Sequence, residues 1–205
     1  MIHIENFIKQ FSSIFADYSH LQAWEITSKL SSILYQFISQ LDDNFDVKNG
    51  IAIHKTAIIE NGVTLKAPII IGENCFIGAH AYFRGGVFLD KSVSIGPACE
   101  IKTSIIFSNS SIAHFNFIGD SIIGHRVNFE AGSLTANHYN ERKDKKISIL
   151  YQSNIIDTNT EKFGSLIGDH SRIGANAVLS PGTILEANSI VKRLELVEQL
   201  NIDKI

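Results

Sequence analysis

Three residues of this sequence could take part in chemistry: one histidine, His114, and two cations, Arg84 and Lys102. Arg84 and Lys102 each follow a large apolar residue of a six-residue repeat by one position, so we expect both side chains to point outward. Neighbouring fixed cations suit a phosphate or a carboxylate, and a guanidinium can hold two oxygens at once. His114 lies between Phe107 and Phe117, where the repeat changes phase, and irregular backbone lets a side chain leave a packed wall. A neutral imidazole there could accept a proton, whereas a lysine would be charged.

Each of these residues also has a simpler interpretation. A lone histidine is more often structural than catalytic, and a single Arg84 or Lys102 could be a solvated surface charge. The residue types alone therefore leave the chemical and the structural alternatives open.

The repeat that positions these residues has a period of six. Glycines recur beside its aliphatic positions, and the period fits neither an α-helix nor one long alternating strand. Three such hexads, about 18 residues, make one turn of a solenoid whose aliphatic side chains point inward. The first series of apolar positions is Ile53, Ile59, Leu65, Ile71, Ile77, Phe83, Leu89, Ile95, Ile101 and Phe107. The step resumes at Phe117, Ile123, Phe129, Ile167, Ile173, Leu179, Leu185 and Val191.

The repeat divides the chain into three parts. Residues 1–50 form a helical segment, for which we expect two helices that pack on the solenoid as a cap or a trimer-packing element. Residues 51–191 form the solenoid, which is interrupted by a polar segment over residues 137–165. This segment is either an arm that leaves the coil and returns to it or a solvated insertion. Residues 192–205 are predicted as a short C-terminal helix and tail. The apolar residues at helical spacing near the N-terminus are Leu21, Trp24, Leu30, Ile33, Leu34, Phe37, Ile38 and Leu41.

The composition restricts the classes of function. With 44% hydrophobic and 19% charged residues the chain is an ordinary globular one, and a net charge of -3 gives it no general attraction for nucleic acid. No apolar run is long enough to span a membrane. Cys75 and Cys99 occupy small-residue positions of the repeat, so we expect two reduced core thiols and a cytoplasmic location.

The segment AHFNFIGDSIIGHRVNFEAGSLTAN, residues 113–137, closely resembles the acetyltransferase domain of bifunctional N-acetylglucosamine-1-phosphate uridylyltransferases. YFRGGVFL from Tyr82, EIK at 100–102 and DTNTEKFGSLIGD at 157–169 resemble the archaeal-type members, and ADYSHLQAWE resembles their interdomain linker. The resemblance implies a mainly β fold, a single-stranded left-handed parallel β-helix of hexapeptide repeats. It also implies a homotrimer, acetyl-CoA as cosubstrate without a metal, and an amino sugar phosphate or nucleotide-linked amino sugar as acceptor. No Gly-rich nucleotide-binding signature precedes the repeat, so we expect no uridylyl transfer.

The resemblance also implies roles for individual residues. His114 becomes the general base that takes a proton as the substrate amine attacks the thioester of acetyl-CoA. Glu130, Ala131 and Ala175 fall on the cofactor side of the site. The residues implied for substrate binding are Arg84, Lys102, Phe117, Asn128, Asn137 and Lys143.

The sequence departs from the resembled family in three places. Phe117 stands where the family has a tyrosine, so one polar contact to the substrate is lost. Glu130-Ala131-Gly132 replaces Gly-Ala-Gly, and the added carboxylate could bind a substrate amine or face solvent. The coils are expected to end after Val191, which would shorten the cofactor groove.

Two other functions remain possible for the same fold. A γ-class carbonic anhydrase needs three histidines that converge on zinc, two of them five residues apart, but the residue five after His114 is Gly119. A non-catalytic trimeric β-helix with an assembly or regulatory role is favoured by Phe117 and the shortened C-terminus. The combined presence of the base, the cations and the amides favours the transferase instead.

Overall fold

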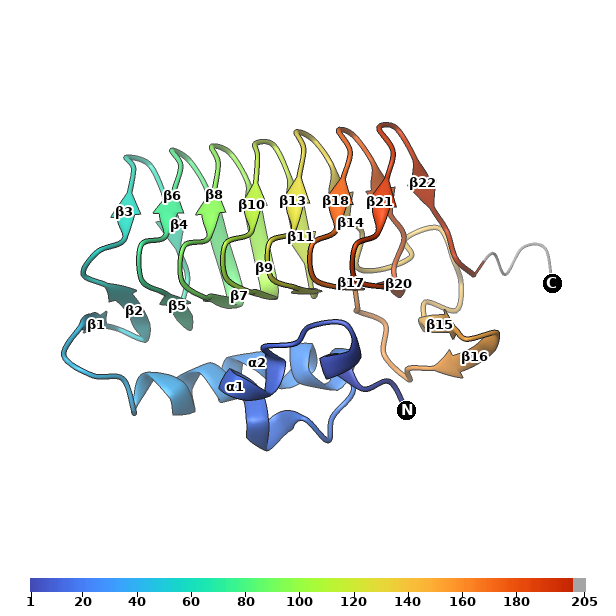
Figure 1. Ribbon diagram of the computed structural model, residues 1–205, viewed down its shortest axis with the longest axis horizontal. Coiled ribbons are helices and arrows are strands. Elements are labelled where there is room, and N and C mark those ends of the chain that lie inside the picture. The colour runs from blue at the N-terminus through green and yellow to red at the C-terminus, as the bar shows by residue number, and fades with distance from the viewer. Residues whose placement is uncertain (201–205) are drawn as a thin grey trace.

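The computed structural model describes residues 1–200, which form a parallel β-helix with two α-helices along one side (Figure 1). The predicted parallel β-helix is therefore confirmed. Neither α-helix within these residues has the length and the apolar character that crossing a membrane would require.

Each coil of the solenoid contributes to three faces, and equivalent strands pair in parallel from coil to coil. The first face comprises β2 (Ile51–His54), β5 (Ile69–Ile71), the ends of β7 (Tyr82–Leu89) and β9 (Glu100–Ile106), β12 (Ile122–Ile123), β17 (Ser165–Ile167) and β20 (Thr183–Leu185). The second face comprises β3 (Ile58–Ile59), β6 (Phe76–Ile77), β8 (Ser94–Ile95), β10 (Ser111–Ile112), β13 (Asn128–Phe129), β18 (Arg172–Ile173) and β21 (Ile190–Val191). The third face comprises β4 (Thr64–Leu65), the starts of β7 and β9, β11 (Phe117–Gly119), β14 (Leu134–Thr135), β19 (Val178–Leu179) and β22 (Leu196–Val197).

Shortened coils explain the phase change near residue 107. Ile69 pairs with Ile51, 18 positions earlier, but Ser111 pairs with Ser94, 17 positions earlier. The inward positions after Ile101 are consequently Ile106, Ile112 and Ile118, which lie in the solenoid core. The assignment of Phe107 and Phe117 to inward positions is therefore wrong.

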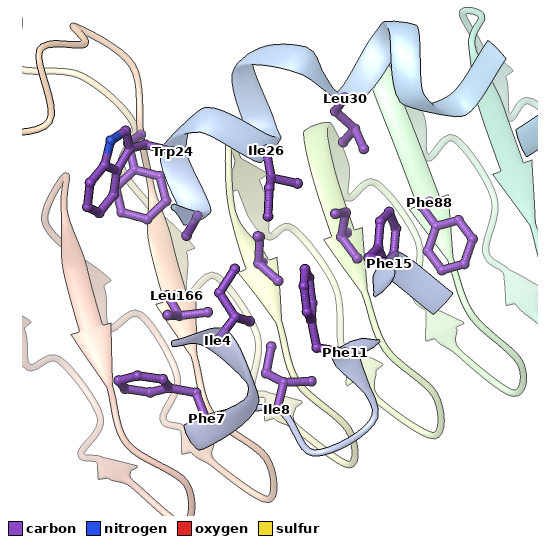
Figure 2. Close-up of a cluster of buried hydrophobic side chains, with 14 of the residues drawn as sticks. Ile4, Phe7, Ile8, Phe11, Phe15, Trp24, Ile26, Leu30, Phe88 and Leu166 are labelled. Carbon is purple, nitrogen blue, oxygen red and sulfur yellow. The ribbon is translucent and has the colours of Figure 1, made fainter. Parts of the chain in front are cut away.

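The first face is apolar on its outer surface as well as its inner one. Its outward residues are at most 8% exposed because the N-terminal segment lies on them, with η1 (Ile4–Asn6), α1 (Phe11–Phe15), η2 (Ala16–Tyr18) and α2 (Ala23–Ile38). Figure 2 shows Phe11, Phe15 and Leu30 pointing toward this face. The outward residues are Ala52, Ile70, Phe88, Ile105, Ile122, Leu166 and Ile184.

The position of the helices refines one prediction. Both expected helices are present, but they lie along a side of the solenoid rather than over its end (Figure 1). The Gln22 side chain and the Glu25 side chain form a capping box that starts α2. Burial of each large side chain in this layer contributes roughly 1.5–3 kcal/mol, so the layer is a second core beside the one inside the coils.

The arm, residues 137–165, packs on its own chain. Strands β15 (Ser148–Tyr151) and β16 (Asn154–Asp157) form an antiparallel hairpin. The ring centroid of Tyr151 lies 5.7 Å from that of Phe7, and the ring centroid of Phe163 lies 5.8 Å from that of Trp24. The arm therefore extends the layer that covers the first face, and it is not a solvated insertion.

The prediction of a short helix over residues 192–205 is wrong for residues 192–200. Leu196 and Val197 form β22, which pairs with β19, so the coils continue past Val191. Gln199 then donates to and accepts from the backbone of Ile184. Residues 201–205 lie outside the described part of the chain.

Both cysteines are buried and free, as the repeat predicts. Burial raises the pKa of the Cys75 thiol to about 11 and also raises the pKa of Cys99. Thiols of this kind react slowly because little thiolate forms near neutral pH. They act as small core residues.

The packing of Phe107 under the helices gives a testable prediction. Its ring is fully buried and contacts Phe11 and Phe15. Phe107→Ala should lower the free energy of unfolding by about 3–5 kcal/mol, measured by urea denaturation. Phe115→Ala is the control, because Phe115 is 71% exposed and its loss should leave no cavity. Equal stabilities of the two variants would show that the helical layer adds little.

Candidate active site

His114 lies on the edge between the second and third faces, in the turn that joins β10 to β11. Its side chain is exposed, and its backbone oxygen accepts a hydrogen bond from the Gly132 N–H at 3.0 Å. The neighbouring Phe115 has a φ of 55° and is 71% exposed, with its ring centroid 5.6 Å from the imidazole at an interplanar angle of 87°. The turn therefore holds the imidazole outside the packed coil, where a ligand can reach it.

The residues implied for cofactor binding lie along the same edge. Glu130 and Ala131 occupy the next turn and Ala175 the one after it, as the stacked turns of the solenoid in Figure 1 illustrate. The Asn176 N–H donates to the Ala131 oxygen at 2.9 Å, which ties the two turns together. Three consecutive turns thus carry His114 and all three of these residues.

Glu130 does not simply face solvent. Its carboxylate accepts hydrogen bonds from Arg193 Nε at 2.9 Å, from Arg193 Nη2 at 3.1 Å and from the Ala175 N–H at 2.9 Å. The Arg193 hydrogen bond, followed by that from Ala175, holds the pKa of Glu130 below its ordinary value. The sequence interpretation missed Arg193, because residues 192–205 were expected to be helical.

The two predicted cations are neighbours on the third face. Arg84 and Lys102 are paired in register between β7 and β9. Neither is a bare charge: Arg84 Nη2 lies 2.6 Å from Glu100 Oε1, and Lys102 forms an ion pair with Asp120. The sequence interpretation did not assign a role to either acidic partner.

Asn137 and Phe117 join this group. The Asn137 amide is 7% exposed and donates a hydrogen bond to Asp120 Oδ2, the oxygen that also binds Lys102. The Phe117 ring lies over Gly119, where an added Cβ would be 2.6 Å from the ring and 3.0 Å from Asn137 Nδ2. Lys102, Asp120 and Asn137 follow one another by about one coil length, which is the sequence signal that could have found Asp120.

Asn128 and Lys143 are not brought to this group within one chain. Asn128 is exposed on the second face, where it lines an open groove of about 540 Å³. Lys143 is exposed on the arm. The residues implied for substrate binding are therefore not all brought together within a single chain. The groove is lined by Asn128, Glu130, Arg172, Ile173, Gly174, Ile190, Val191, Lys192 and Arg193.

Among residues 1–200, no three His, Cys, Asp or Glu side chains come together in a way that could hold a metal ion.

The sequence matches two models of hexapeptide repeats. Residues 50–85 match the model described as bacterial transferase hexapeptide (six repeats), and residues 166–192 match the hexapeptide repeat of succinyl-transferase. The chain is also homologous to the acetyltransferase region of the GlmU proteins over about 80% of its length. The chain thus contains hexapeptide repeats of the bacterial transferase type and is homologous to the GlmU acetyltransferase region.

Three relatives illustrate this homology. A bifunctional sugar-1-phosphate nucleotidylyltransferase/acetyltransferase from Sulfurisphaera tokodaii is 33% identical over 76% of this chain and 38% of its own length. The bifunctional protein GlmU from Methanococcus vannielii is 33% identical over 86% of this chain and 43% of the relative. GlmU from Picosynechococcus sp. is 30% identical over 80% of this chain and 35% of the relative. The chain thus spans less than half the length of these relatives.

The Glu130–Arg193 pair predicts a pH-dependent contribution to stability. Because the folded-state pKa of Glu130 lies below its ordinary value of 4.5, the pair stabilises the fold above that pH and the effect is lost as the pH falls through the folded-state pKa. Glu130→Gln should therefore lower Tm at pH 7 but not at about pH 2.5, as measured by differential scanning calorimetry.

Arg193→Met should give the same loss, and the double variant should lose no more than either single variant. A Tm difference that persists unchanged at acid pH, or that adds in the double variant, would contradict this ion pair.

Proposed function

We propose that this chain transfers an acetyl group from acetyl-CoA to the amino group of a small amino sugar phosphate, with His114 as general base. The observation that carries the proposal is the exposed imidazole at one end of a row of turns that continues through Glu130, Ala131 and Ala175. The Sulfurisphaera tokodaii relative is named a sugar-1-phosphate nucleotidylyltransferase/acetyltransferase, which supports this chemistry.

The proposed reaction uses the residues in separate roles. The substrate nitrogen attacks the thioester carbonyl carbon, and His114 accepts a proton from that nitrogen. The carbon–sulfur bond then breaks, and the CoA thiolate leaves and takes up a proton. Arg84 and Lys102 would hold the sugar phosphate, and Asn137 would hydrogen-bond the sugar. Phe117 offers a ring where a hydroxyl is otherwise expected, so the acceptor gains an apolar contact and no hydrogen bond there.

The proposed site needs a second chain. Asn128 and the groove lie on the second face, whereas Arg84, Lys102 and Asn137 lie on the third face, around an edge of the solenoid. A neighbouring copy that brings its second face against this third face would place both sets in one cleft. We therefore propose a homotrimer in which adjacent chains share each site, and the buried free thiols suit a reducing cytoplasm.

A non-catalytic assembly role is the second candidate. The observation that favours it is the pairing of both cations with carboxylates of the same chain, which lowers the net charge offered to a phosphate. Turnover of acetyl-CoA separates the two candidates, because an assembly protein would show none.

The proposed base gives the first kinetic prediction. His114→Ala should lower kcat by about 10²- to 10⁴-fold with glucosamine 1-phosphate and acetyl-CoA, measured by thiol release, because the attacking amine loses its proton acceptor. His80→Ala is the matched control, since His80 is also exposed on the edge between the second and third faces. Its kcat and the Tm of both variants should stay near those of the wild type. Wild-type activity retained by His114→Ala would eliminate the assigned base.

The shared site gives a second prediction. Arg84→Ala and Asn128→Ala should each be weakly active alone, because each damages one wall of every site. Trimers assembled from both variants should regain activity, since some sites then combine an intact third face with an intact second face. The measurement is kcat/KM of mixed trimers isolated through two different tags. Activity equal to the average of the two separate variants would place each site within a single chain.

A further inference from the structure

Asp120 holds together two members of the third-face group, which comprises Arg84, Lys102, Phe117 and Asn137. The sequence resemblance implies no role for Asp120. It follows β11 with a φ of 45°, and its N–H donates to the Lys102 backbone oxygen at 2.8 Å. Its own backbone oxygen accepts a hydrogen bond from the Gly164 N–H at 2.9 Å. The backbone of Asp120 is therefore fixed between the preceding coil and the point where the arm returns to the solenoid.

One oxygen of the Asp120 carboxylate accepts from two neighbouring coils. Oδ2 binds Lys102 Nζ from the coil before and Asn137 Nδ2 from the coil after. The Asp120 side chain is 8% exposed and that of Lys102 is 13% exposed, so water screens this pair much less than it screens the Arg84–Glu100 pair, at 41% and 36%. A single buried acceptor thus fixes the separation of one cation and one amide.

We infer that Asp120 is a positioning residue for the amino sugar substrate. It holds the Lys102 ammonium and the Asn137 amide at the spacing that this substrate requires. The inference rests on the proposed transferase function. An ammonium has three donors, so Lys102 can bind Asp120 and still donate to an anion of the substrate. The Asn137 amide oxygen lies 3.3 Å from His138 Nδ1, and its second lone pair can still accept from the substrate. Asp120 itself would touch no substrate atom.

The chain contains a matched control for this residue. The tripeptide Ile-Gly-Asp occurs at residues 118–120 and again at residues 167–169, and both aspartates are 6% exposed. The Asp169 carboxylate accepts from the Lys9 and His125 backbone N–H groups, and so holds the N-terminal segment and a turn between the first and second faces. Asp169→Asn therefore shows how the loss of a buried carboxylate affects the protein when that carboxylate has no contact with the third-face group.

The first test measures position without requiring activity. Wild type, Asp120→Ala, Asp120→Asn and Asp169→Asn are labelled with N-hydroxysuccinimide acetate, and the labelling of Lys102 is measured by mass spectrometry relative to the exposed Lys91. Asp120→Ala should raise the relative labelling of Lys102 about tenfold, because its ammonium loses the partner that holds it. Asp169→Asn should leave it unchanged. Equal labelling in wild type and Asp120→Ala would overturn the inference whether or not the protein is an enzyme.

The second test is kinetic and uses the same four proteins. Asp120→Ala should raise KM for glucosamine 1-phosphate about 10- to 100-fold, with KM for acetyl-CoA unchanged, because the acceptor contacts move while the cofactor edge does not. Asp120→Asn keeps an acceptor for Asn137 and should fall between wild type and Asp120→Ala. Asp169→Asn should lower Tm without changing either KM. An equal rise in KM for Asp169→Asn would attribute the effect to general loosening and overturn the positioning role.

The two tests keep the inference separate from the proposed function. A wild-type protein without turnover would refute the transferase, while the labelling result would still decide whether Asp120 holds Lys102. Normal turnover by Asp120→Ala with an unchanged KM for glucosamine 1-phosphate would refute the positioning role and leave the transferase proposal intact.

Discussion

The stacking of each coil on the next in fixed register is the constraint on which the rest of this structure depends. Backbone hydrogen bonds between coils keep one residue of each hexad inward, and a shift of one position would turn that residue out to solvent. The chain keeps this register even where coils shorten from 18 to 17 residues, because the register shift falls between Arg84 and Val87, where β7 passes from the third face to the first. Side chains one coil apart therefore become neighbours, and this converts a linear spacing into a site.

That constraint explains how much of the molecule could be predicted. A strict period of six gives the core directly, since only a solenoid stacks such residues. The sequence places the phase change at His114, but Ile106, Ile112 and Ile118 keep the step of six there, and the shorter step lies between Ile101 and Ile106. The positions of Phe107 and Phe117 were misassigned because both series were extended at a constant step through the short coils. Large apolar residues on adjacent positions, such as Ile106 and Phe107, cannot be separated into inner and outer ones without knowing the coil length.

Features that depend on distant parts of the chain were the ones the sequence did not reveal. The segment KRLELVEQL has leucines at spacings that fit a helix, yet the open edge of β19 offers backbone hydrogen bonds that a helix there would leave unmade. Arg193, which binds Glu130, was missed for the same reason. The apolar outer surface of the first face does leave a signal, because Ile70, Phe88 and Ile105 recur once per coil, immediately before an inward residue.

In the proposed transferase, the charge pairs of the third face would limit the kind of anion that the site can accept. Each cation has a carboxylate partner in its own chain, so long-range attraction between the site and a phosphate is weak and recognition must come from directed hydrogen bonds. A guanidinium has five donors and an ammonium has three, and one carboxylate does not use them all. In that site the more exposed Arg84 could exchange Glu100 for a ligand, whereas the less exposed Lys102 would keep Asp120, since separating that pair would leave an uncompensated charge. In the proposed site the two cations would therefore have different roles, because Arg84 could move with the ligand whereas Lys102 would fix the position at which the ligand binds.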